Sequence, residues 1–407
     1  MLTVEEAQEQ VLAAVTRLNT EERPLLEALG SILAADAVTD IDLPPFANSA
    51  MDGYAVHASD TVNASSEHPC VLPVIGEIAA GDAPAFAVPP GSAARIMTGA
   101  PLPAGADAVI PVEQTAGDRS AVHVLAPVTS GTFVRRAGED FRQGASLLAS
   151  GTVLGPGELG LLASSGHAFV QVYRRPEVAV LSTGNELIAI DQKPRPGQIR
   201  NSNTPMLAAQ VLAAGAVPRM LPVARDSRQE VLAALEAARS ADLVISSGGV
   251  SVGDHDVVRD VMKEIGGIDF WRVRMRPGRP IAFGRAGRTP FLGLPGNPVS
   301  AYVTFELFAR PMLRKMAGHR ALLRRPIAML TDSPVSGAPD RRNYVRAFAR
   351  WEDDGWHVSV VGKQESHLLS SAIAVNALIV VPEGSPDAAT GSTVQAILLD
   401  WPEQPWP

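Results

Sequence analysis

The sequence predicts a multidomain α/β plus β protein, with a central three-layer αβα domain, an inserted β domain and a small C-terminal β-barrel domain. At 407 residues the chain is longer than one hydrophobic core usually organises, which favours roughly two to four domains. Strands and helices alternate from residue 177 to about 317, as in a mostly parallel sheet covered on both faces. Strand-like runs fill residues 44 to 140 and the chain after residue 325, so β domains are expected there.

An N-terminal helical and linker domain is expected from two separate pieces of chain, residues 1–42 and 141–175. Thr3 and Glu6 have the spacing of a capping box, and apolar residues such as Val11 and Val15 follow at helical spacing. A second helix is predicted at Pro156–Ser165 and should pack back against the N-terminal helices. Residues 43–140 then form an inserted β-rich domain, whose strands include Val71–Ile75, Ala108–Pro111 and Ala121–Leu125.

The αβα domain is expected at residues 176–322. Helices are predicted at Pro205–Ala214, where Thr204 would be the N-cap, at Arg228–Ala238 and from Val299 onward. Strands are predicted at Val178–Leu181, Val217–Val223, Leu243–Ser246, Ile281–Phe283 and Phe291–Leu294.

The C-terminal β-barrel domain is expected at residues 323–407. Its Pro-rich end, Trp401–Pro407, has the composition of a frayed tail. Its strands are predicted at Ile327–Leu330, Val345–Trp351, Trp356–Val361, Ala377–Val381 and Val394–Leu399.

Composition excludes several classes of protein. Hydrophobic residues make up 46% and charged residues 19% of the chain, and no run of about 18 apolar residues predicts a membrane span. The N-terminus lacks the features of a secretory signal, so we expect a cytoplasmic protein. A single cysteine, Cys70, excludes an internal disulfide and any cysteine-rich metal site. The net charge of -8 argues against nucleic-acid binding and favours small-molecule or protein partners.

Chemistry is expected at one edge of the central sheet, because ligands bind beyond the carboxyl ends of parallel strands. Small residues let a ligand approach the backbone, and free N–H groups at a helix start bind phosphate. The turns there match neither a Walker A loop nor a dinucleotide-binding fingerprint, so they predict another kind of anion site. They are Ser182–Glu186, Ser247–Asp256 and Pro295–Pro298.

A basic segment lies between two of these turns, with four arginines in the eight residues from Arg272 to Arg279. Arg272, Arg274 and Arg276 would alternate onto one face of a strand, where guanidinium groups suit tetrahedral oxyanions. A solvated basic strand is the alternative. Carboxylates on the same rim favour a hard cation such as Mg²⁺ bridging to phosphate oxygens, although Asp226 could instead cap the helix that follows it. These carboxylates are Asp226, Asp254 and Asp256.

The inserted domain carries three further motifs. Asp52-Gly53, Met97–Pro103 and Arg135–Asp140 are rich in turn-forming residues. Taken singly, each is typical of a structural turn.

Together, however, these strings resemble the MoeA family, which the C-terminal region of gephyrin shares. The segment Asn48–Ala55 is similar to the family's signature segment, and four more segments follow in the family's order over nearly the whole chain. These are Arg95–Pro101, Arg136–Asp140, Ser182–Leu187 with Ser246–Asp256, and Arg276–Pro280 with Gly293–Ser300.

The resemblance implies a homodimer of four-domain subunits, with an active site in a cleft completed by the partner's second domain. One subunit would contribute Asp52, Thr98, Arg135 and Asp140. The other would contribute Glu186, Asp226, Asp256, Arg272, Arg276, Arg279, Pro295 and Pro298. In the fourth domain Arg342 and Ser366 would contact molybdate, whereas His367 is expected to be structural or to lie on the rim.

The implied activity is that of a transferase, which inserts molybdate into adenylylated molybdopterin with Mg²⁺-dependent release of AMP. Asp226, Asp256 and Glu186 are the expected Mg²⁺ ligands, and a pterin-adenylating protein and acceptor molybdoenzymes are possible partners. The resemblance also implies a set of residues that bind the substrate, in the family's molybdopterin-binding domain and in the barrel. They are Ser182, Thr183, Gly184, Ser247, Gly248, Gly249, Val250, Ser251, Gly253, Pro295, Gly296, Asn297, Pro298, Arg342 and Ser366.

Departures from the family pattern leave alternatives open. Ala47 and Asn185 stand where Asp is common, Glu365 where Gly is common, and arginines replace the family's lysines in the basic segment. Because arginine is planar and permanently charged, this exchange bears on how an oxyanion is placed. The alternatives are a paralogue that prefers tungstate and a pterin-binding scaffold without catalysis. The pterin-adenylating step itself is less favoured, because proteins of that kind resemble the third domain alone.

Overall fold

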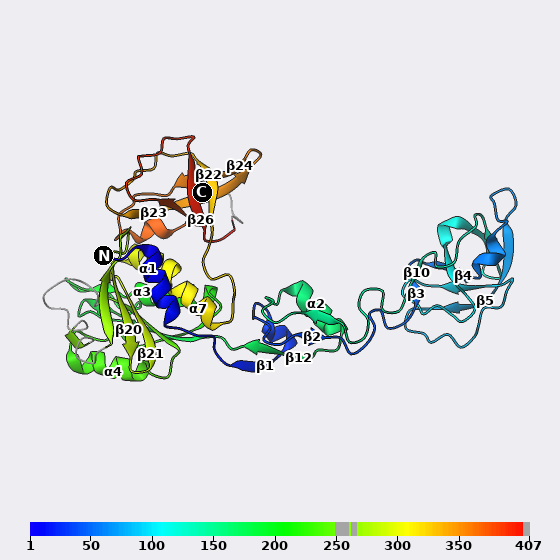
Figure 1. Ribbon diagram of the computed structural model, residues 1–407, viewed down its shortest axis with the longest axis horizontal. Coiled ribbons are helices and arrows are strands. Elements are labelled where there is room, and N and C mark those ends of the chain that lie inside the picture. Colours follow the sequence, from blue (N-terminus) through cyan, green and yellow to red (C-terminus); the bar gives the residue numbers. More distant parts are fainter. Residues whose placement is uncertain (249–259, 262–266, 402–407) are drawn as a thin grey trace. The chain divides into compact units, whose positions relative to one another are not determined.

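The computed structural model describes residues 1–248, 260–261 and 267–401. These residues form two compact units, one of residues 1–22, 30–34 and the described residues after 170, and one of residues 23–29 and 35–170 (Figure 1). No helix among the described residues is long and apolar enough to cross a membrane.

The N-terminal segment is only partly helical. Helix α1 covers Val4–Ala13, and the predicted capping box is confirmed, since Thr3 and Glu6 each accept a backbone N–H of the other. The expectation of helix up to residue 42 is wrong beyond this point. Strand β1, Thr20–Pro24, pairs with β12, Phe169–Tyr173, and a short 3-10 helix, η1, follows at Leu25–Ala28. Pro24 favours this outcome, because it disfavours helical geometry for the residue before it.

The predicted helix in the second piece is α2, Pro156–Ser164, which contacts η1 within the smaller unit. Nearby, the short strands β2, Ala37–Val38, and β11, Ser146–Leu148, pair with each other. The same unit contains a six-stranded sheet, whose strand β4 is buried on both faces. Tyr54 and Val56 belong to one hydrophobic cluster, and Ala55 between them belongs to another. The strands in spatial order are β7 Ala108–Pro111, β4 Gly53–Val56, β6 Ala93–Ile96, β5 Cys70–Ile78, β9 Ala121–Val124 and β8 Thr115–Gly117.

The central domain is a three-layer αβα sandwich, as predicted. Val178 and Val180 pack in a cluster with α1, α3, α6 and α7, whereas Ala179 and Leu181 pack in a second cluster with α4. The helices are α3 Asn203–Ala213, α4 Arg228–Ala238, α6 Pro298–Thr304 and α7 Arg310–Met316, with a π-helical turn η4 at Phe305–Ala309.

The sheet of this domain has six strands. The first four in spatial order are parallel to one another, and β20 then runs antiparallel to both of its neighbours, β21 and β18. In that order they are β16 Val217–Met220, β13 Glu177–Ser182, β17 Leu243–Ser247, β21 Thr289–Leu294, β20 Pro280–Ala286 and β18 Ile268–Arg272.

Two local predictions in this domain are wrong. Helix α3 starts at Asn203 with Ser202 as the N-cap, because the Thr204 hydroxyl is engaged by Ser182 and Asn201. The basic segment is not one strand. Arg272 ends β18, and the Val273 N–H then donates to the Arg279 carbonyl at 2.9 Å. Met275–Arg276 forms a separate strand, β19, which pairs with a strand of the C-terminal domain, so the arginines do not share one face.

The C-terminal domain is a closed five-stranded barrel, as predicted. Strand β23 pairs with β24 on one side and with β25 on the other, which closes the sheet around Met329, Val345, Ala347 and Val358. The barrel strands are β22 Pro326–Thr331, β23 Arg342–Glu352, β24 Gly355–Val360, β25 Ala377–Val381 and β26 Thr393–Leu398.

Candidate active site

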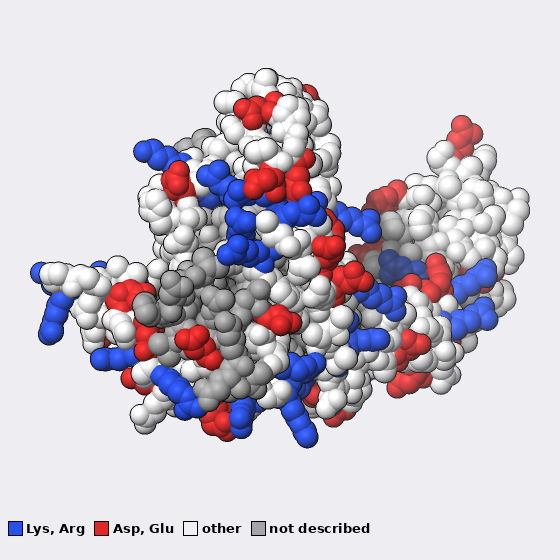
Figure 2. All heavy atoms as spheres, turned by 60° about the vertical axis from the view of Figure 1, so that its left-hand side comes forward, with Lys and Arg blue, Asp and Glu red and all other residues white. Residues whose placement is uncertain are grey.

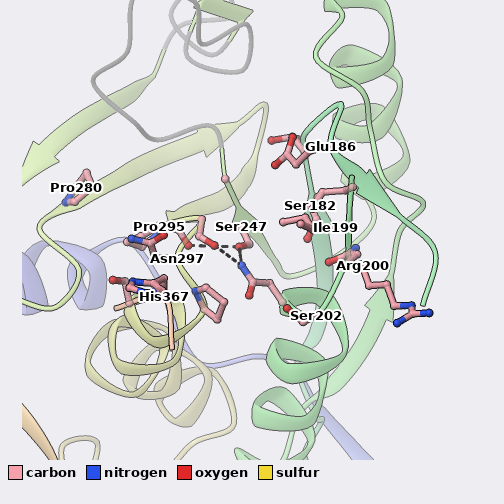
Figure 3. Close-up of a pocket in the computed structure, with 18 residues that line it drawn as sticks. Ser182, Glu186, Ile199, Arg200, Ser202, Ser247, Pro280, Pro295, Asn297 and His367 are labelled. Carbon is pink, nitrogen blue, oxygen red and sulfur yellow. Dashed lines mark hydrogen bonds between the residues drawn. The ribbon is translucent and has the colours of Figure 1, made fainter. Parts of the chain in front are cut away.

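The described residues of the three predicted turns meet at one edge of the central sheet and line a pocket of about 600 Å³ (Figure 3). They meet because β13, β17 and β21 are adjacent and parallel, with Ser182 in register with Ser247 and Ser247 with Leu294. Gly184 and Asn185 of the first turn do not line the pocket, and the Gly184 N–H donates to the Ala224 carbonyl at 3.1 Å. The turn residues that line the pocket are Ser182, Thr183, Glu186, Ser247, Gly248, Pro295, Gly296, Asn297 and Pro298.

Asn203 links two of the turns. Its Nδ2 donates to the Ser247 hydroxyl and to the Gly296 carbonyl, both at 2.7 Å. Its Oδ1 is buried and has no hydrogen-bond partner among the described residues. A buried acceptor of this kind loses stability unless a donor reaches it. The pocket therefore offers a polar ligand at least one acceptor.

The backbone comes close to the pocket at Gly248. This residue has φ +92°, and a Cβ there would lie 3.0 Å from the Thr183 carbonyl oxygen. A side chain is disfavoured both by conformation and by space, so the turn keeps its backbone exposed to a ligand.

One wall of the pocket was missed by the sequence analysis. The missed residues come from β15, Ile199–Arg200, which pairs with β14, Leu187–Ile188, and from the start of α3. A strand of two residues produces no periodic pattern in the sequence, so this wall of the pocket was not predicted. The missed lining residues are Leu187, Ile199, Arg200, Asn201, Ser202 and Asn203.

The barrel also reaches this pocket. The Asn297 amide donates to the Ser366 hydroxyl at 3.0 Å, and the Val299 N–H donates to the Ser366 carbonyl at 3.2 Å. His367 lines the pocket on the side of Pro295 and Asn297 (Figure 3). His367, which was expected to be structural or to lie on the rim, thus belongs to the lining itself.

The predicted arginines are distributed over different places. Arg272 is exposed at the end of β18, and the Nη2 atom of Arg279 lies 3.4 Å from the Met1 sulfur. Arg276 lines a separate cavity of about 240 Å³ together with Asn343 and Arg346. Basic and acidic side chains gather side by side where the barrel meets the αβα domain (Figure 2).

Arg342 has a partner other than the pocket. Its guanidinium forms an ion pair with Glu5 of α1, and both residues line a third cavity, of about 160 Å³. The structure does not bring Arg342 to the pocket of the three turns, so its contact with molybdate stays a prediction without support from this arrangement.

Two of the predicted Mg²⁺ ligands, Glu186 and Asp226, are among the described residues, and they lie in different positions. Glu186 lines the pocket. Asp226 forms a reciprocal pair with Asn185, in which each backbone N–H donates to the other's side chain, at 3.1 and 3.2 Å. Asp226 does not cap α4, because Ser227 does so. The predicted site residues Gly249, Val250, Ser251, Gly253, Asp254 and Asp256 lie outside the described residues.

The three motifs of the inserted domain lie together within the smaller unit. Short strands β3, Asn48–Ser49, and β10, Val134–Arg135, pair with each other, and Asn48 also bridges to Pro101. The Asp140 N–H donates to the Leu43 carbonyl at 3.0 Å. Arg135 and Asp140 are both exposed at this end of the domain.

Asp52 and Thr98 form a defined pair in this group. One Asp52 oxygen accepts from the Thr98 N–H at 2.7 Å and from its hydroxyl at 2.8 Å. The backbone bond first, and then the hydroxyl bond, lower the pKa of Asp52. Asp52 is therefore an exposed, ionised carboxylate with one oxygen held by Thr98.

Family models cover most of the chain. The N-terminal region (domain I and II) of MoeA matches residues 2–166, a probable molybdopterin binding domain matches residues 179–315, and the C-terminal region (domain IV) of MoeA matches residues 330–399.

Relatives match over nearly their full lengths. Molybdopterin molybdenumtransferase 2 of Mycobacterium tuberculosis is 39% identical over 97% of this chain and 99% of its own. Molybdopterin molybdenumtransferase of Haemophilus influenzae is 37% identical over 97% of this chain and 98% of its own. The crystal structure of the molybdopterin biosynthesis moeA protein from Pyrococcus horikoshii superposes with a TM-score of 0.83 at 30% identity, covering 98% of this chain and all of that one. The chain is therefore a transferase of the MoeA, or molybdopterin molybdenumtransferase, family.

Proposed function

We propose that this protein inserts molybdate into adenylylated molybdopterin and releases AMP in a Mg²⁺-dependent reaction. One observation carries the proposal. The turns after three parallel strands form a pocket of small and polar residues, and a loop of the barrel closes one side of it. Such turns suit a phosphate-bearing ligand.

The residues that we assign to the site, in the pocket and in the basic segment outside its lining, divide into two roles under this proposal. The turns at Ser182–Gly184, Ser247–Gly248 and Pro295–Pro298 bind the pterin nucleotide through backbone N–H groups and the amide of Asn203. Arg272, Arg276 and Arg279 stabilise negative charge on the oxyanions, the kind of electrostatic help that dominates such transfers. The two dithiolene sulfurs replace two oxo groups of molybdate, which leave as water with the thiol protons and two further protons. Water cleaves the phosphoanhydride in the coupled step and gives AMP and the pterin phosphate. No covalent protein intermediate is needed.

Two carboxylates at this edge of the sheet, Glu186 in the pocket lining and Asp226 paired with the adjacent Asn185, have the donor chemistry that suits a hard cation. Glu186 and Asp226 offer carboxylate oxygens, the ligand type that Mg²⁺ prefers, and Asp226 keeps one oxygen beyond its bond to Asn185. Mg²⁺ binds few protein ligands and keeps water or phosphate oxygens as the rest. When bound, the ion would neutralise charge on the diphosphate.

The proposal includes a cytoplasmic homodimer, with each active site shared between two subunits. Asp52, Thr98, Arg135 and Asp140 of one subunit would face the pocket of the other. Acceptor molybdoenzymes and a pterin-adenylating protein are the proposed protein partners.

AMP release from adenylylated molybdopterin tests this proposal directly. The protein is incubated with Mg²⁺ and with molybdate, tungstate or neither, and product transfer is followed by reconstitution of a cofactor-free molybdoenzyme. We expect molybdate-dependent AMP release with reconstitution. Faster release with tungstate would identify a tungstate-preferring paralogue, and tight nucleotide binding without turnover would identify a binding protein.

A further inference from the structure

A group of metal-ligand residue types lies on the hairpin of β23 and β24 in the barrel. Glu352 ends β23, Asp354 lies in the turn, and His357 lies in β24. One ligand atom of each residue lies within 4.8 Å of the ligand atoms of the other two. None of the three residues lines the pocket of the three turns. The proposed reaction therefore gives this group no role.

The separations of the ligand atoms suit one small cation. His357 Nε2 lies 2.8 Å from Asp354 Oδ1 and 3.6 Å from Glu352 Oε2. Zn²⁺ binds imidazole nitrogen and carboxylate oxygen at about 2.0–2.2 Å, which places neighbouring ligands of a tetrahedral ion roughly 3.3 Å apart. Both measured separations lie close to this value, so small side-chain shifts are enough to admit an ion.

Asp332, which is not one of the three, orients the imidazole. His357 Nδ1 donates to Asp332 Oδ1 at 3.0 Å, and the other Asp332 oxygen accepts from the Ser359 hydroxyl at 2.7 Å. Histidine ligands of metals almost always donate their second ring N–H to such a partner, which fixes the ring and makes the ligand nitrogen more basic. His357 has this arrangement, and its Nε2 is the nitrogen that lies near Asp354 and Glu352.

Arg350 holds two of the surrounding carboxylates in place. Its Nε donates to Glu352 Oε1 and its Nη1 to Asp332 Oδ2, both at 2.6 Å. These bonds use one oxygen of each carboxylate and leave Glu352 Oε2 and Asp332 Oδ1 on the side of the imidazole. The group therefore combines a histidine with an outer layer of fixed partners, which a surface accumulation of acidic residues does not need.

We propose that Glu352, Asp354 and His357 bind a divalent transition-metal ion such as Zn²⁺. The imidazole favours such an ion over Mg²⁺, which prefers oxygen ligands. The ion forms a bond to Nε2, and any proton on that nitrogen leaves to solvent. Three protein ligands leave one position of a tetrahedral ion for water or for a group from a partner. This inference does not rest on the proposed function, because its test contains no substrate.

Calorimetric titration of the full-length protein with Zn²⁺ tests the site. The protein is untagged and freed of metal with EDTA, which is then removed, and excess Mg²⁺ occupies sites that bind through oxygen alone. We expect one Zn²⁺ to bind saturably per chain, and Asp354→Asn to weaken this binding about tenfold or more. Asp353→Asn is the matched control, because it removes the same charge from the same turn but belongs to no ligand group.

The control separates a built site from general attraction to an acidic turn. Asp353→Asn should keep the wild-type affinity. Equal weakening by Asp353→Asn and Asp354→Asn would overturn the proposal, and so would the absence of saturable binding to the wild type.

Tryptophan fluorescence gives a second readout of the same event. Trp356 precedes His357 and stacks edge-on against Trp351, with the ring centroids 5.5 Å apart. Zn²⁺ at this hairpin should change the fluorescence and saturate at the concentration found by calorimetry. His357→Asn should abolish both signals, whereas His68→Asn, which changes an exposed histidine of the smaller unit, should keep both. Binding that survives His357→Asn, or is lost in His68→Asn, would contradict the assignment.

A further variant keeps the test decisive if a ligand substitution prevents folding, which circular dichroism checks. Asp332→Asn retains all three ligands but removes the charge of the group that orients His357. It should weaken Zn²⁺ binding by about 10–100-fold, the usual effect of losing such a partner. Wild-type affinity in a folded Asp332→Asn protein would refute the role of Asp332 and, with it, the built site.

Discussion

Asp52 shows how single residues prepare the proposed chemistry. Its carboxylate is exposed, yet one oxygen is held by two bonds from Thr98. Because hydrogen bonds to the ionised form lower a carboxyl pKa, Asp52 stays ionised well below neutral pH. Such a group can accept a proton or attract a cation, but it does not donate a proton at pH 7.

Thr98→Val separates the two bonds. The substitution removes the hydroxyl but keeps the backbone N–H, which makes the larger contribution to the lowered pKa. We expect the Asp52 pKa to rise only part of the way toward its ordinary value, as measured by carboxyl NMR titration. Thr129→Val, in the same unit but bonded to Thr132, is the control. An Asp52 pKa equal to that of the wild type would contradict a contribution from the hydroxyl.

Residues of the pocket lining could be predicted where an apolar strand leads directly into a turn. Ser182, Ser247 and Pro295 were expected at one edge because β13 and β17 are continuous apolar runs, and β21 has a similar pattern. Asn203 was missed because its role depends on contacts with Ser247 and Gly296, which are distant along the chain. Arg342 was assigned to the site from its motif, but the side chain lies beside Glu5, whose proximity no local pattern encodes.

At the scale of elements, the pairing of β4 with β7 explains why Gly53 stands in the segment Asn48–Ala55. A Cβ on Gly53 would lie 2.0 Å from the Ile110 carbonyl oxygen of the paired strand β7. The substitution must therefore separate β4 from β7, next to Asp52.

Gly53→Ala should destabilise the protein by about 1–3 kcal/mol, the usual cost of forcing extra atoms into a packed region. Gly160→Ala is the opposite control, because Gly160 lies within α2 with nothing within 4 Å of its Cβ position. It should be neutral or stabilise by up to about 1 kcal/mol. Urea denaturation of both variants measures the difference, and equal stabilities would show that β4 adjusts without cost.

The hairpin of β23 and β24 should make stability depend on pH. His357 lies between Asp332, at 3.0 Å from Nδ1, and Asp354, at 2.8 Å from Nε2. The Asp332 bond first, and then the Asp354 bond, raise the pKa of His357 above its ordinary 6.5. The folded state therefore binds this proton more tightly than the unfolded state. The stabilisation is complete below about pH 6.5 and is lost as pH rises through the folded-state pKa.

His357→Asn tests this dependence. The loss of stability should be at most about 1 kcal/mol near pH 6, because the pair is close to the surface, and should vanish near pH 9. Chemical denaturation at the two pH values checks the result. A loss of equal size at both would attribute the effect to packing and not to charge.

Element prediction worked best where packing reinforces local preference. Helix α4 was predicted at its observed bounds, because Ser227 caps it and one face is buried against Leu181 and Val244. The prediction of helix beyond Ala13 was wrong, because β1 forms by pairing with β12, about 150 residues later in the chain. Long-range pairing of this kind leaves little trace in a local pattern. The barrel strands were found because each is a short, mainly apolar run between loop segments, although buried and exposed positions do not alternate regularly within them.

At the scale of the whole molecule, the two compact units interleave along the sequence. The chain passes between them at residues 22–23, 29–30, 34–35 and 170–171. Composition changes near residue 44 indicated an insertion, but the sequence alone does not tell how such units meet. The proposed candidates divide between the units, with Asp52 and Thr98 in the smaller and Glu186 and Asp226 in the larger.

Mixing two inactive variants tests whether an active site is shared between subunits. Asp52→Asn alters only the smaller unit, and Glu186→Gln only the larger. In a dimer with shared sites, one site of each mixed dimer has both changes and the other has neither. Random assembly of equal amounts makes half of the dimers mixed, so about a quarter of all sites are intact and about a quarter of wild-type AMP release should return.

Sites built within single subunits predict a different result, because every subunit of the mixture then keeps one damaged site. The mixture would stay as inactive as either variant alone. Subunits are exchanged by dissociation and reassociation, with differently tagged chains to count mixed dimers, and each variant alone sets the background. Mixed dimers without recovered activity would place Asp52 and Glu186 in the same subunit's site. Recovery near one quarter would instead show that Asp52 of one subunit acts together with Glu186 of its partner, so that the active site requires two subunits.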